Sequence, residues 1–382
     1  MKRFLLVSHY TLAAGPVQKL DAYLRKNKKF QVTTIYHPLF PNINLPSRIV
    51  NSRNTSFSYK IPFAQYCFEV IVNYWFLKSK ANEKYFDAVI CFDPLSYFYC
   101  FLLRLFFKFK INIYFNVDFS RKRFINGLLN FIYQRLNLFA YANCDYFFAI
   151  TYNFVEAIDP KNTIKPKSRI FRLKHTFDIN ELKKRKNIHK INHSLIFIGS
   201  FYYSLEFETL FQALAELKKK EINFVFHLYG SGNLHAIKNL IEKYSLKKEV
   251  KIKQAKPYSE LISTVLPQYQ IGVCPYDSTR NQSKISFVQE ADDLTTKMVD
   301  YISCGLPFIT TLISPKLKFI EDEKIGFVVL SKTEWINLLK QLLTDKNLYK
   351  KLSRNTLAFA KKYDGKKVYG PIFKQILLEN SL

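Results

Sequence analysis

The stretch KMVDYISCGLPFITT, residues 297–311, predicts a short helix that runs directly into a strand. Gly305 suits the left-handed residue that ends a helix, and Pro307 prevents the helix from continuing. The free amides at the start of the helix and the positive end of its dipole favour a phosphate there, and Lys297 adds a full positive charge. Asp300 lies one turn further in, where its carboxylate can accept two hydrogen bonds from the vicinal hydroxyls of a ribose. An exposed ion pair between Lys297 and Asp300 is the simpler alternative.

The residues just before this helix add a cap and a carboxylate. Thr295 or Thr296 is expected to cap the helix, because a hydroxyl oxygen accepts a hydrogen bond from an amide of the first turn. Asp292 stands in the loop that leads to the helix, from where it would face the part of a ligand beyond the phosphate. Glu290 and Asp293 compete with Asp292 for this position.

Outward from this stretch, apolar runs alternate with helical patterns along the whole chain. The strands expected in the first half are RFLLVSHY, FQVTTIYH, FDAVICFD, INIYFNVDF and CDYFFAIT, with helices over residues 16–26, 95–110 and 125–142. The order restarts with the strand SLIFIGSF and continues through FHLYGSG, VKIKQA, IGVCPY, FITT and GFVVL. This βαβα order predicts two doubly wound α/β domains with a cleft between them and with ligands at the carboxyl ends of the strands.

Composition places the chain among globular proteins and gives it a strong positive charge. Its 382 residues, 48% of them hydrophobic, suffice for two domains with separate cores. Its six cysteines are scattered and read as buried thiols of a reducing compartment, and no run of about 18 apolar residues predicts a spanning helix. The net charge is +28, and residues 1–185 carry +18 of it, with 29 Lys and Arg against 11 Asp and Glu. Such a field attracts polyanions, either nucleic acid or a leaflet of anionic lipid.

Several segments, taken in order, resemble one enzyme family. KMVDYISCGLPFI is similar to the pattern K-x-x-E-Y-x-x-x-G-x-P-x-[IV], and IFIGSF, FHLYGSG and VKIKQAKPYSEL look like the strands and turns that precede it. These features resemble the retaining nucleotide-sugar glycosyltransferases of the GT-B fold, glycosyltransferase family 4 in particular. The family's paired glutamates correspond here to Asp292 and Asp300.

The resemblance implies a donor site and a metal-independent transfer. It assigns the ribose to Asp300, the donor sugar to Asp292, and the diphosphate to Lys297 and the amides of Thr295 and Thr296, with Gly199, Gly230 and Gly232 lining the site. No metal or other cofactor is expected. One departure is that GSFYYSLEFE lacks the Arg and Lys that many members place after the first strand of the donor domain. Lys284 or Arg280 would then assist Lys297.

The acceptor side is matched less closely. Members often place a His at the end of a strand in the first domain, where IYFNVDFSRKRF has Asp118 followed by Arg121 and Arg123. We take Asp118 as the candidate for accepting the acceptor's proton, although it could equally cap a helix or pair with an arginine. His9, at the end of the first strand and close to Gly15, is the second candidate.

The domain boundaries follow from this assignment. A polar, basic stretch over residues 161–192 contains the run KKRK and is expected to be the linker. We expect an acceptor-binding domain over residues 1–185, a donor-binding domain over 186–365, and a C-terminal helix over 366–382 that packs back toward the first domain.

Residues 96–110, SYFYCFLLRLFFKFK, have two interpretations. They form either a core helix with a basic end or an interfacial helix against an anionic leaflet, to which Tyr74–Lys78 would add a second contact. With the charge of the first half, the second interpretation favours an acceptor linked to a lipid.

The sequence therefore predicts a cytoplasmic glycosyltransferase, peripheral on the inner face of the membrane, that moves a hexosyl unit to a glycan acceptor such as a lipid-linked surface polysaccharide or glycolipid. A nucleotide-sugar epimerase or hydrolase of the same fold is the first alternative. A nucleic-acid-binding protein driven by charge is the second, although the basic residues do not follow a recognisable RNA-binding pattern. An inactive subunit of glycosyltransferase-like fold is the third.

Overall fold

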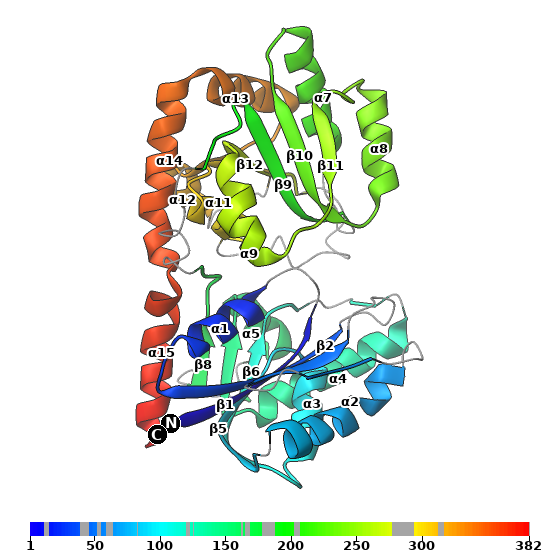
Figure 1. Cartoon of the computed structure of the whole chain (residues 1–382), viewed down its shortest axis with the longest axis vertical. Helices are drawn as coiled ribbons and strands as arrows, with labels where there is room; N and C mark the ends of the chain where they lie inside the picture. The colour runs from blue at the N-terminus through cyan, green and yellow to red at the C-terminus, as the bar shows by residue number, and fades with distance from the viewer. Residues whose placement is uncertain are drawn as a thin grey trace. The chain divides into compact units, whose positions relative to one another are not determined.

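The computed structural model describes residues 1–10, 15–38, 46–51, 55–58, 64–81, 83–119, 123–124, 126–161, 163–164, 169–177, 188–201, 207–276, 294–311 and 317–381. The chain divides into two compact units (Figure 1). Unit 1 consists of Met1–Lys174 and Gly365–Leu382, and unit 2 consists of His175–Asp364. The junction predicted at residues 185 and 186 lies outside the described residues.

Unit 1 alternates strands and helices as the sequence predicts, with an added hairpin at one edge. Its elements are β1 (Lys2–Tyr10), α1 (Pro16–Arg25), β2 (Phe30–Pro38), β3 (Ser47–Val50), β4 (Thr55–Phe57), α2 (Ala64–Trp75) with a π-helical turn at Phe76–Ala81, β5 (Tyr85–Cys91), α3 (Pro94–Leu103), β6 (Lys108–Asn116), α4 (Gly127–Asn143), β7 (Tyr146–Ala149), α5 (Tyr152–Ile158) and β8 (Ile170–Arg172). The sheet order is β4-β3-β2-β1-β5-β6-β7-β8. The pairings of β2 with β3 and of β3 with β4 are antiparallel, and the other pairings are parallel.

The last helix of the chain completes unit 1. α15 (Gly365–Glu379) contributes Tyr369, Phe373 and Ile376 to the core that β1 begins with Phe4. The rings of Phe4 and Phe373 lie 6.0 Å apart. The predicted return of the C-terminal helix to the first domain is confirmed. Figure 1 shows α1 and α15 on one face of the sheet and α2, α3 and α4 on the other.

Unit 2 repeats the doubly wound arrangement. Its elements are β9 (Ser194–Ser200), α7 (Phe207–Lys219), β10 (Val225–Ser231), α8 (Leu234–Lys243), β11 (Val250–Lys253), α9 (Tyr258–Glu260) followed by a π-helical turn at Leu261–Val265 and a 3₁₀ turn at Leu266–Gln268, β12 (Ile271–Cys274), α11 (Thr296–Ser303), β13 (Phe308–Thr310), α12 (Phe319–Asp322), β14 (Gly326–Val328), α13 (Lys332–Thr344), α14 (Lys346–Ala360) and a 3₁₀ turn at Lys361–Tyr363. The sheet order is β11-β10-β9-β12-β13-β14, and all pairings are parallel. The predicted fold class, two doubly wound α/β domains, is confirmed.

The helix expected over residues 95–110 is wrong in its second half. α3 ends at Leu103, and Lys108 already begins β6, where Lys108 pairs with Tyr85 of β5. Within α3, Tyr97, Tyr99, Cys100 and Leu103 are buried, so this helix belongs to the core. An all-apolar run does not reveal by itself where a buried helix ends and a buried strand begins. In the described part of the chain, the model contains no helix with the length and apolar composition needed to span a membrane.

Candidate functional site

The sheet of unit 2 reverses direction beside β9. The chain passes from β9 to β10 on one side, and β12 later pairs with β9 on the other side. In open α/β sheets such a switch point leaves a crevice at the carboxyl ends of the two strands, where ligands bind. Gly199 lies at this end of β9, and Tyr276 follows β12.

Lys297 reaches this switch point from the first turn of α11. Its ammonium group lies 5.3 Å from the ring centroid of Phe197 and 5.2 Å from that of Tyr276. Among the described residues no carboxylate forms an ion pair with it. Burial lowers the pKa of Lys297, while the nearby Cys274 raises it to a lesser extent. A partly buried cation that has aromatic faces but no described carboxylate beside it is a site suited to an anion.

Two glycines make room for this lysine. Gly199 has a φ of +139°, and a Cβ there would overlap Cε of Lys297. Gly230, its partner on β10, approaches so closely that a Cβ would overlap the carbonyl oxygen of Gly199. Gly232 follows with a φ of +131°. The glycines predicted for the donor site therefore have a local reason in the backbone and in the packing of Lys297.

The start of α11 differs in detail from the expectation. Thr295 is the N-cap residue, but its side chain makes no capping hydrogen bond and instead accepts one from the Tyr276 hydroxyl at 3.0 Å. The hydroxyl of Thr296 lies 3.2 Å from Nδ1 of His175. The prediction that a threonine hydroxyl caps the first turn is thus wrong, because both hydroxyls contact neighbouring side chains.

The end of α11 agrees with the expectation. Gly305 has a φ of +70°, its amide donates to the carbonyl of Ile302, and the amide of Leu306 donates to the carbonyl of Tyr301. These bonds form the Schellman motif of a helix that ends on glycine.

Asp300 lies deeper along α11 and is 3% exposed. Its Oδ1 accepts a hydrogen bond of 2.9 Å from the hydroxyl of Tyr258 in α9. No ion pair joins it to Lys297 within the described structure, so the simpler alternative of an exposed pair is wrong. The arrangement holds one carboxylate in a fixed orientation, one helical turn from an unpaired cation.

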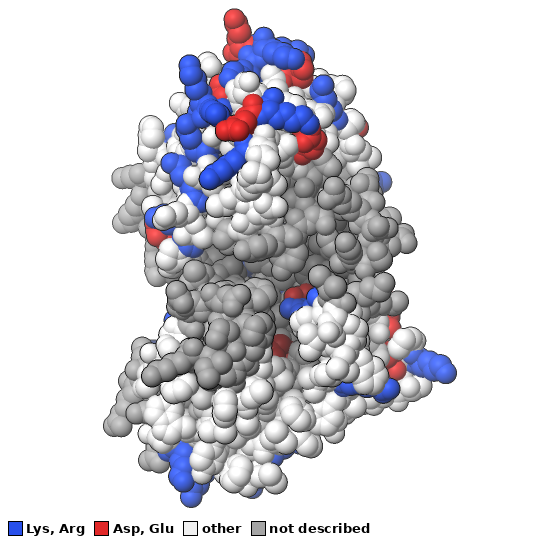
Figure 2. All heavy atoms as spheres, turned by 90° about the vertical axis from the view of Figure 1, so that its right-hand side faces the viewer, with Lys and Arg blue, Asp and Glu red and all other residues white. Residues whose placement is uncertain are grey.

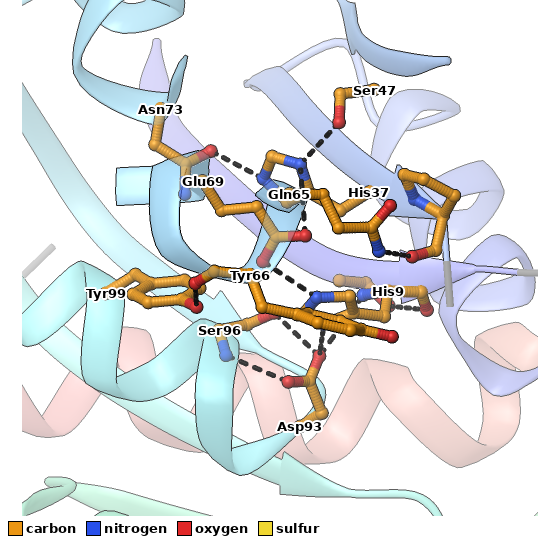
Figure 3. A network of polar contacts seen from close by, with 12 residues as sticks. His9, His37, Ser47, Gln65, Tyr66, Glu69, Asn73, Asp93, Ser96 and Tyr99 are labelled. Carbon is orange, nitrogen blue, oxygen red and sulfur yellow. Dashed lines mark hydrogen bonds and ion pairs between the residues drawn. The ribbon is translucent and has the colours of Figure 1, made fainter. Parts of the chain in front are cut away.

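Unit 1 has its own switch point, between β1 and β5, and His9 occupies it. Its Nδ1 lies 3.0 Å from Oδ2 of Asp93, which follows β5, and its Nε2 lies 2.9 Å from Oε2 of Glu69 on α2 (Figure 3). Asp93 also caps α3, since its Oδ1 accepts the amide of Ser96. His37, at the end of β2, completes this network, with its ring nitrogens bonded to Ser47 and Asn73.

This network fixes the charge of its histidines. Burial alone would lower the pKa of His9, but the carboxylates of Asp93 and Glu69 outweigh it and raise the pKa well above the usual value. Burial raises the pKa of Asp93, but His9 and the hydrogen bonds of Ser96 lower it below its usual range. Burial lowers the pKa of His37. Both ring nitrogens of His9 lie within hydrogen-bond distance of carboxylates, which favour the imidazolium, and the assignment of His9 to the acceptor side stays a prediction.

The other acceptor-side candidates divide into three cases. Asp118 lies beyond the end of β6 and accepts a 2.9 Å hydrogen bond from Nη1 of Arg123, so of its open alternatives the arginine partner is the one seen. The amide of Gly15 donates to the side chain of Gln18 at 2.7 Å, within the first turn of α1. Arg121 lies outside the described residues.

The loop before α11 lies outside the described residues as well. Asp292, predicted to contact the donor sugar, belongs to it, together with Glu290, Asp293, Lys284 and Arg280. Their assignments stay predictions.

Three polar residues of these sites escaped the sequence analysis. Asp93 had a detectable signal, since an aspartate followed by proline after a strand is typical of a helix N-terminus. Glu69 is the single charged residue of α2, which could have marked it. Tyr258 gave no signal, because its contact with Asp300 spans 42 residues.

Solved structures of known proteins resemble this chain over both of its units. A search of curated protein sequences returned no significant match. Among solved structures, sucrose-phosphate synthase from Thermosynechococcus elongatus superposes with a TM-score of 0.71 at 13% identity, over 99% of this chain and 100% of that one. WaaG, a glycosyltransferase involved in lipopolysaccharide biosynthesis, gives 0.58 at 14% identity over 96% and 97%. UDP-GlcNAc 2-epimerase from Neisseria meningitidis, bound to UDP-GlcNAc, gives 0.58 at 12% over 99% and 100%.

The fold is therefore the GT-B fold of two doubly wound domains. Residues 178–358 match the model of the family described as Glycosyl transferases group 1, which spans nearly all of unit 2. This match lies within unit 2, and the likeness of fold extends over both units.

Proposed function

We propose that this protein is a glycosyltransferase that moves a hexosyl unit from a nucleotide diphosphate sugar to a glycan acceptor, with retention of the anomeric configuration. The observation that carries the proposal is Lys297, a partly buried cation at the switch point of unit 2 that contacts two aromatic rings and forms no ion pair with the described carboxylates. A diphosphate would supply the missing negative charge, and the N-terminal dipole of α11 would add to the attraction.

Three residues then bind different parts of the donor. Lys297 and the first-turn amides of α11 bind the diphosphate, and Asp300, oriented by Tyr258, binds the ribose hydroxyls. Asp292 contacts the sugar. The leaving diphosphate is stabilised by these preorganised groups without a metal ion, as electrostatic catalysis allows.

On the acceptor side, Asp118 takes the proton of the acceptor hydroxyl, and Arg121 and Arg123 bind nearby. Its ion pair with Arg123 fixes the orientation of the Asp118 carboxylate. We propose a lipid-linked acceptor, a surface polysaccharide or glycolipid, and a cytoplasmic protein that works peripherally on the inner face of the membrane. The support is the +18 charge of residues 1–185, from 29 basic and 11 acidic residues.

The first experiment is a thermal-shift screen of UDP-, GDP- and ADP-sugars, followed by transfer of a radiolabelled sugar from the one that binds. A labelled glycan is the expected product. The Asp300→Ala variant should bind the same donor more weakly and unfold at nearly the same temperature. Unchanged affinity would refute the assignment of Asp300.

A nucleotide-sugar epimerase is the second candidate, because UDP-GlcNAc 2-epimerase superposes as well as WaaG does, each with a TM-score of 0.58. The same labelled donor separates the two. An epimerase returns isomerised sugar without an acceptor, whereas the transferase leaves the label on the glycan.

A further inference from the structure

Helix α2 of unit 1 has its polar residues inside and its apolar residues outside. Gln65, Glu69 and Asn73 follow one another at four-residue spacing and are buried at 3%, 0% and 0% exposure. On the opposite side, three large apolar side chains are exposed: Phe68 (52%), Ile71 (58%) and Trp75 (39%). A surface helix of a water-soluble domain has the reverse pattern.

The inner side of α2 explains only half of this pattern. Glu69 binds His9, and Oδ1 of Asn73 accepts a 2.8 Å hydrogen bond from Nε2 of His37, so the polar residues are required at the carboxyl ends of β1 and β2. Nothing in that network requires the outer residues to be apolar. Their exposure needs a separate reason.

The neighbouring elements continue the apolar surface. α3 packs between α2 and α4, and the ring of Tyr74 on α2 lies 5.0 Å from that of Phe106, just after α3. We call the exposed apolar residues of this surface the α2–α4 face; they are Phe68, Ile71, Trp75, Leu102, Leu105, Phe106, Leu128, Leu129, Phe131 and Ile132. Figure 2, which views the side of unit 1 where α2, α3 and α4 lie in Figure 1, shows a broad area of uncharged residues there.

The charges around this face have one sign. Within residues 64–81, 94–110 and 126–143 the one acidic residue is Glu69, which is buried and bonded to His9. Lys110 donates to the carbonyl oxygen of Asn380 after α15, on the other side of the sheet, and the other basic residues in the same ranges with described side chains are Lys78, Arg104, Lys108 and Arg135. A second copy docking through the same face would bring these cations together across a two-fold axis. An anionic lipid surface satisfies both the apolar side chains and the cations.

We propose that the α2–α4 face docks onto an anionic lipid bilayer and inserts its aromatic and aliphatic side chains among the acyl chains. The inference deepens the proposed function, on which it rests for the lipid-linked acceptor. Of the two interpretations of residues 96–110, the core helix fits most of α3, and the exposed residues come from α2, α4, the end of α3 at Leu102 and the turn after it. α2 then separates the lipid surface from the polar network around His9 by the thickness of one helix.

A cysteine of α2 allows a direct test. Cys67 is exposed and the five other cysteines are buried, so an environment-sensitive thiol dye labels this position selectively. With phosphatidylglycerol vesicles and no nucleotide, the dye emission should shift to shorter wavelength. Equal shifts with phosphatidylcholine vesicles would overturn the choice of an anionic bilayer. The absence of any shift would overturn the docking itself.

A variant on the unlabelled protein tests the side chains. Phe68→Ser, Ile71→Ser and Trp75→Ser combined should weaken co-sedimentation with phosphatidylglycerol vesicles at least tenfold. The matched control is Leu330→Ser in unit 2, which removes an apolar side chain of 65% exposure and should change nothing. An unchanged thermal midpoint of both variants shows that they fold. Undiminished sedimentation of the folded triple variant would contradict the proposal.

The alternative partner for the α2–α4 face is a second copy of the chain. Light scattering without vesicles should find the same mass for the wild type and the triple variant. A wild-type dimer that the triple variant abolishes would replace the bilayer by a protein interface. Because nucleotide sugar is absent from these measurements, failure of the donor assignment would leave their outcome unaffected.

Discussion

The two units have the same doubly wound topology, but the cations at their switch points have different surroundings. In unit 1, His9 is an imidazolium enclosed by two carboxylates, with a side chain 4% exposed. In unit 2, Lys297 reaches the equivalent place with aromatic rings around it and no ion pair among the described residues. A cation whose partners are already present stabilises the fold, whereas a cation without them retains its capacity to bind an anion. The comparison separates a structural charge from a ligand-binding one.

The largest expected effect is on the stability of unit 1. His9→Gln leaves Glu69 and Asp93 as buried carboxylates without their cation, and we expect the free energy of unfolding to fall by about 3 kcal/mol. Urea denaturation measures it. As a control, His235→Gln changes a surface residue of α8 whose ring contacts the side chain of Asn239, and it should have an effect within about 0.5 kcal/mol. Similar losses of unfolding free energy in His9→Gln and His235→Gln would show that the ion pairs of His9 do not stabilise unit 1.

Lys297→Met should affect donor binding and not stability, the opposite of His9→Gln. Removing a partly buried cation that forms no ion pair among the described residues leaves the unfolding free energy unchanged or raises it, while donor affinity falls about 100-fold, or roughly 2.7 kcal/mol. Calorimetric titration with the nucleotide sugar found in the screen measures the affinity. Lys218→Met, which removes a lysine paired with Glu249 in the same unit, is the matched control and should bind normally. Tight binding by Lys297→Met would place the diphosphate elsewhere.

The ion pairs of His9 also predict a pH dependence. The pKa of His9 is raised in the folded protein, so its stabilising contribution is complete below about pH 6.5, the unfolded value, and is lost as the pH rises through the folded pKa. Asp93 has a lowered pKa, and its contribution is lost instead as the pH falls below about 3.9. The stability difference between wild type and His9→Gln should therefore shrink above pH 7, by at most about 1.4 kcal/mol per pH unit. A difference that grows with pH would contradict a charged His9.

The smallest effect concerns the orientation of Asp300. Tyr258→Phe removes the 2.9 Å hydrogen bond to its carboxylate, and we expect donor affinity to fall by up to tenfold, about 1.4 kcal/mol. A competition assay with the free nucleoside diphosphate and with the diphosphate alone locates the loss. A loss for the nucleotide but not for the diphosphate agrees with a ribose site at Asp300, and equal losses for both would exclude it.

The sequence was informative where the signal is local. The stretch at residues 297–311 predicted the helix, its glycine end and the following strand, because capping and proline rules act over a few residues. The restart of the strand and helix order near residue 194 predicted a second doubly wound domain in the same way. Both predictions are confirmed.

Features that depend on contacts between residues far apart in the sequence could not be predicted. Glu69 and His9 are 60 residues apart, so no local pattern could show that His9 is enclosed by carboxylates. The hairpin of β3 and β4 was missed because its strands are short and sit at a sheet edge. In α2 the periodicity was present, but a helical period alone does not tell which side faces the core. The membrane contact was consequently expected on α3, the most apolar helix, which is in the core.

Helix α15 is made last, after all of unit 2, yet it packs against the first strand of unit 1 through Phe373 and Phe4. During synthesis the first domain must therefore wait for the end of the chain to leave the ribosome before its core can close. Unit 2 is contiguous and can fold while that wait lasts. The order of translation is thus the reverse of the order in which the two cores are completed.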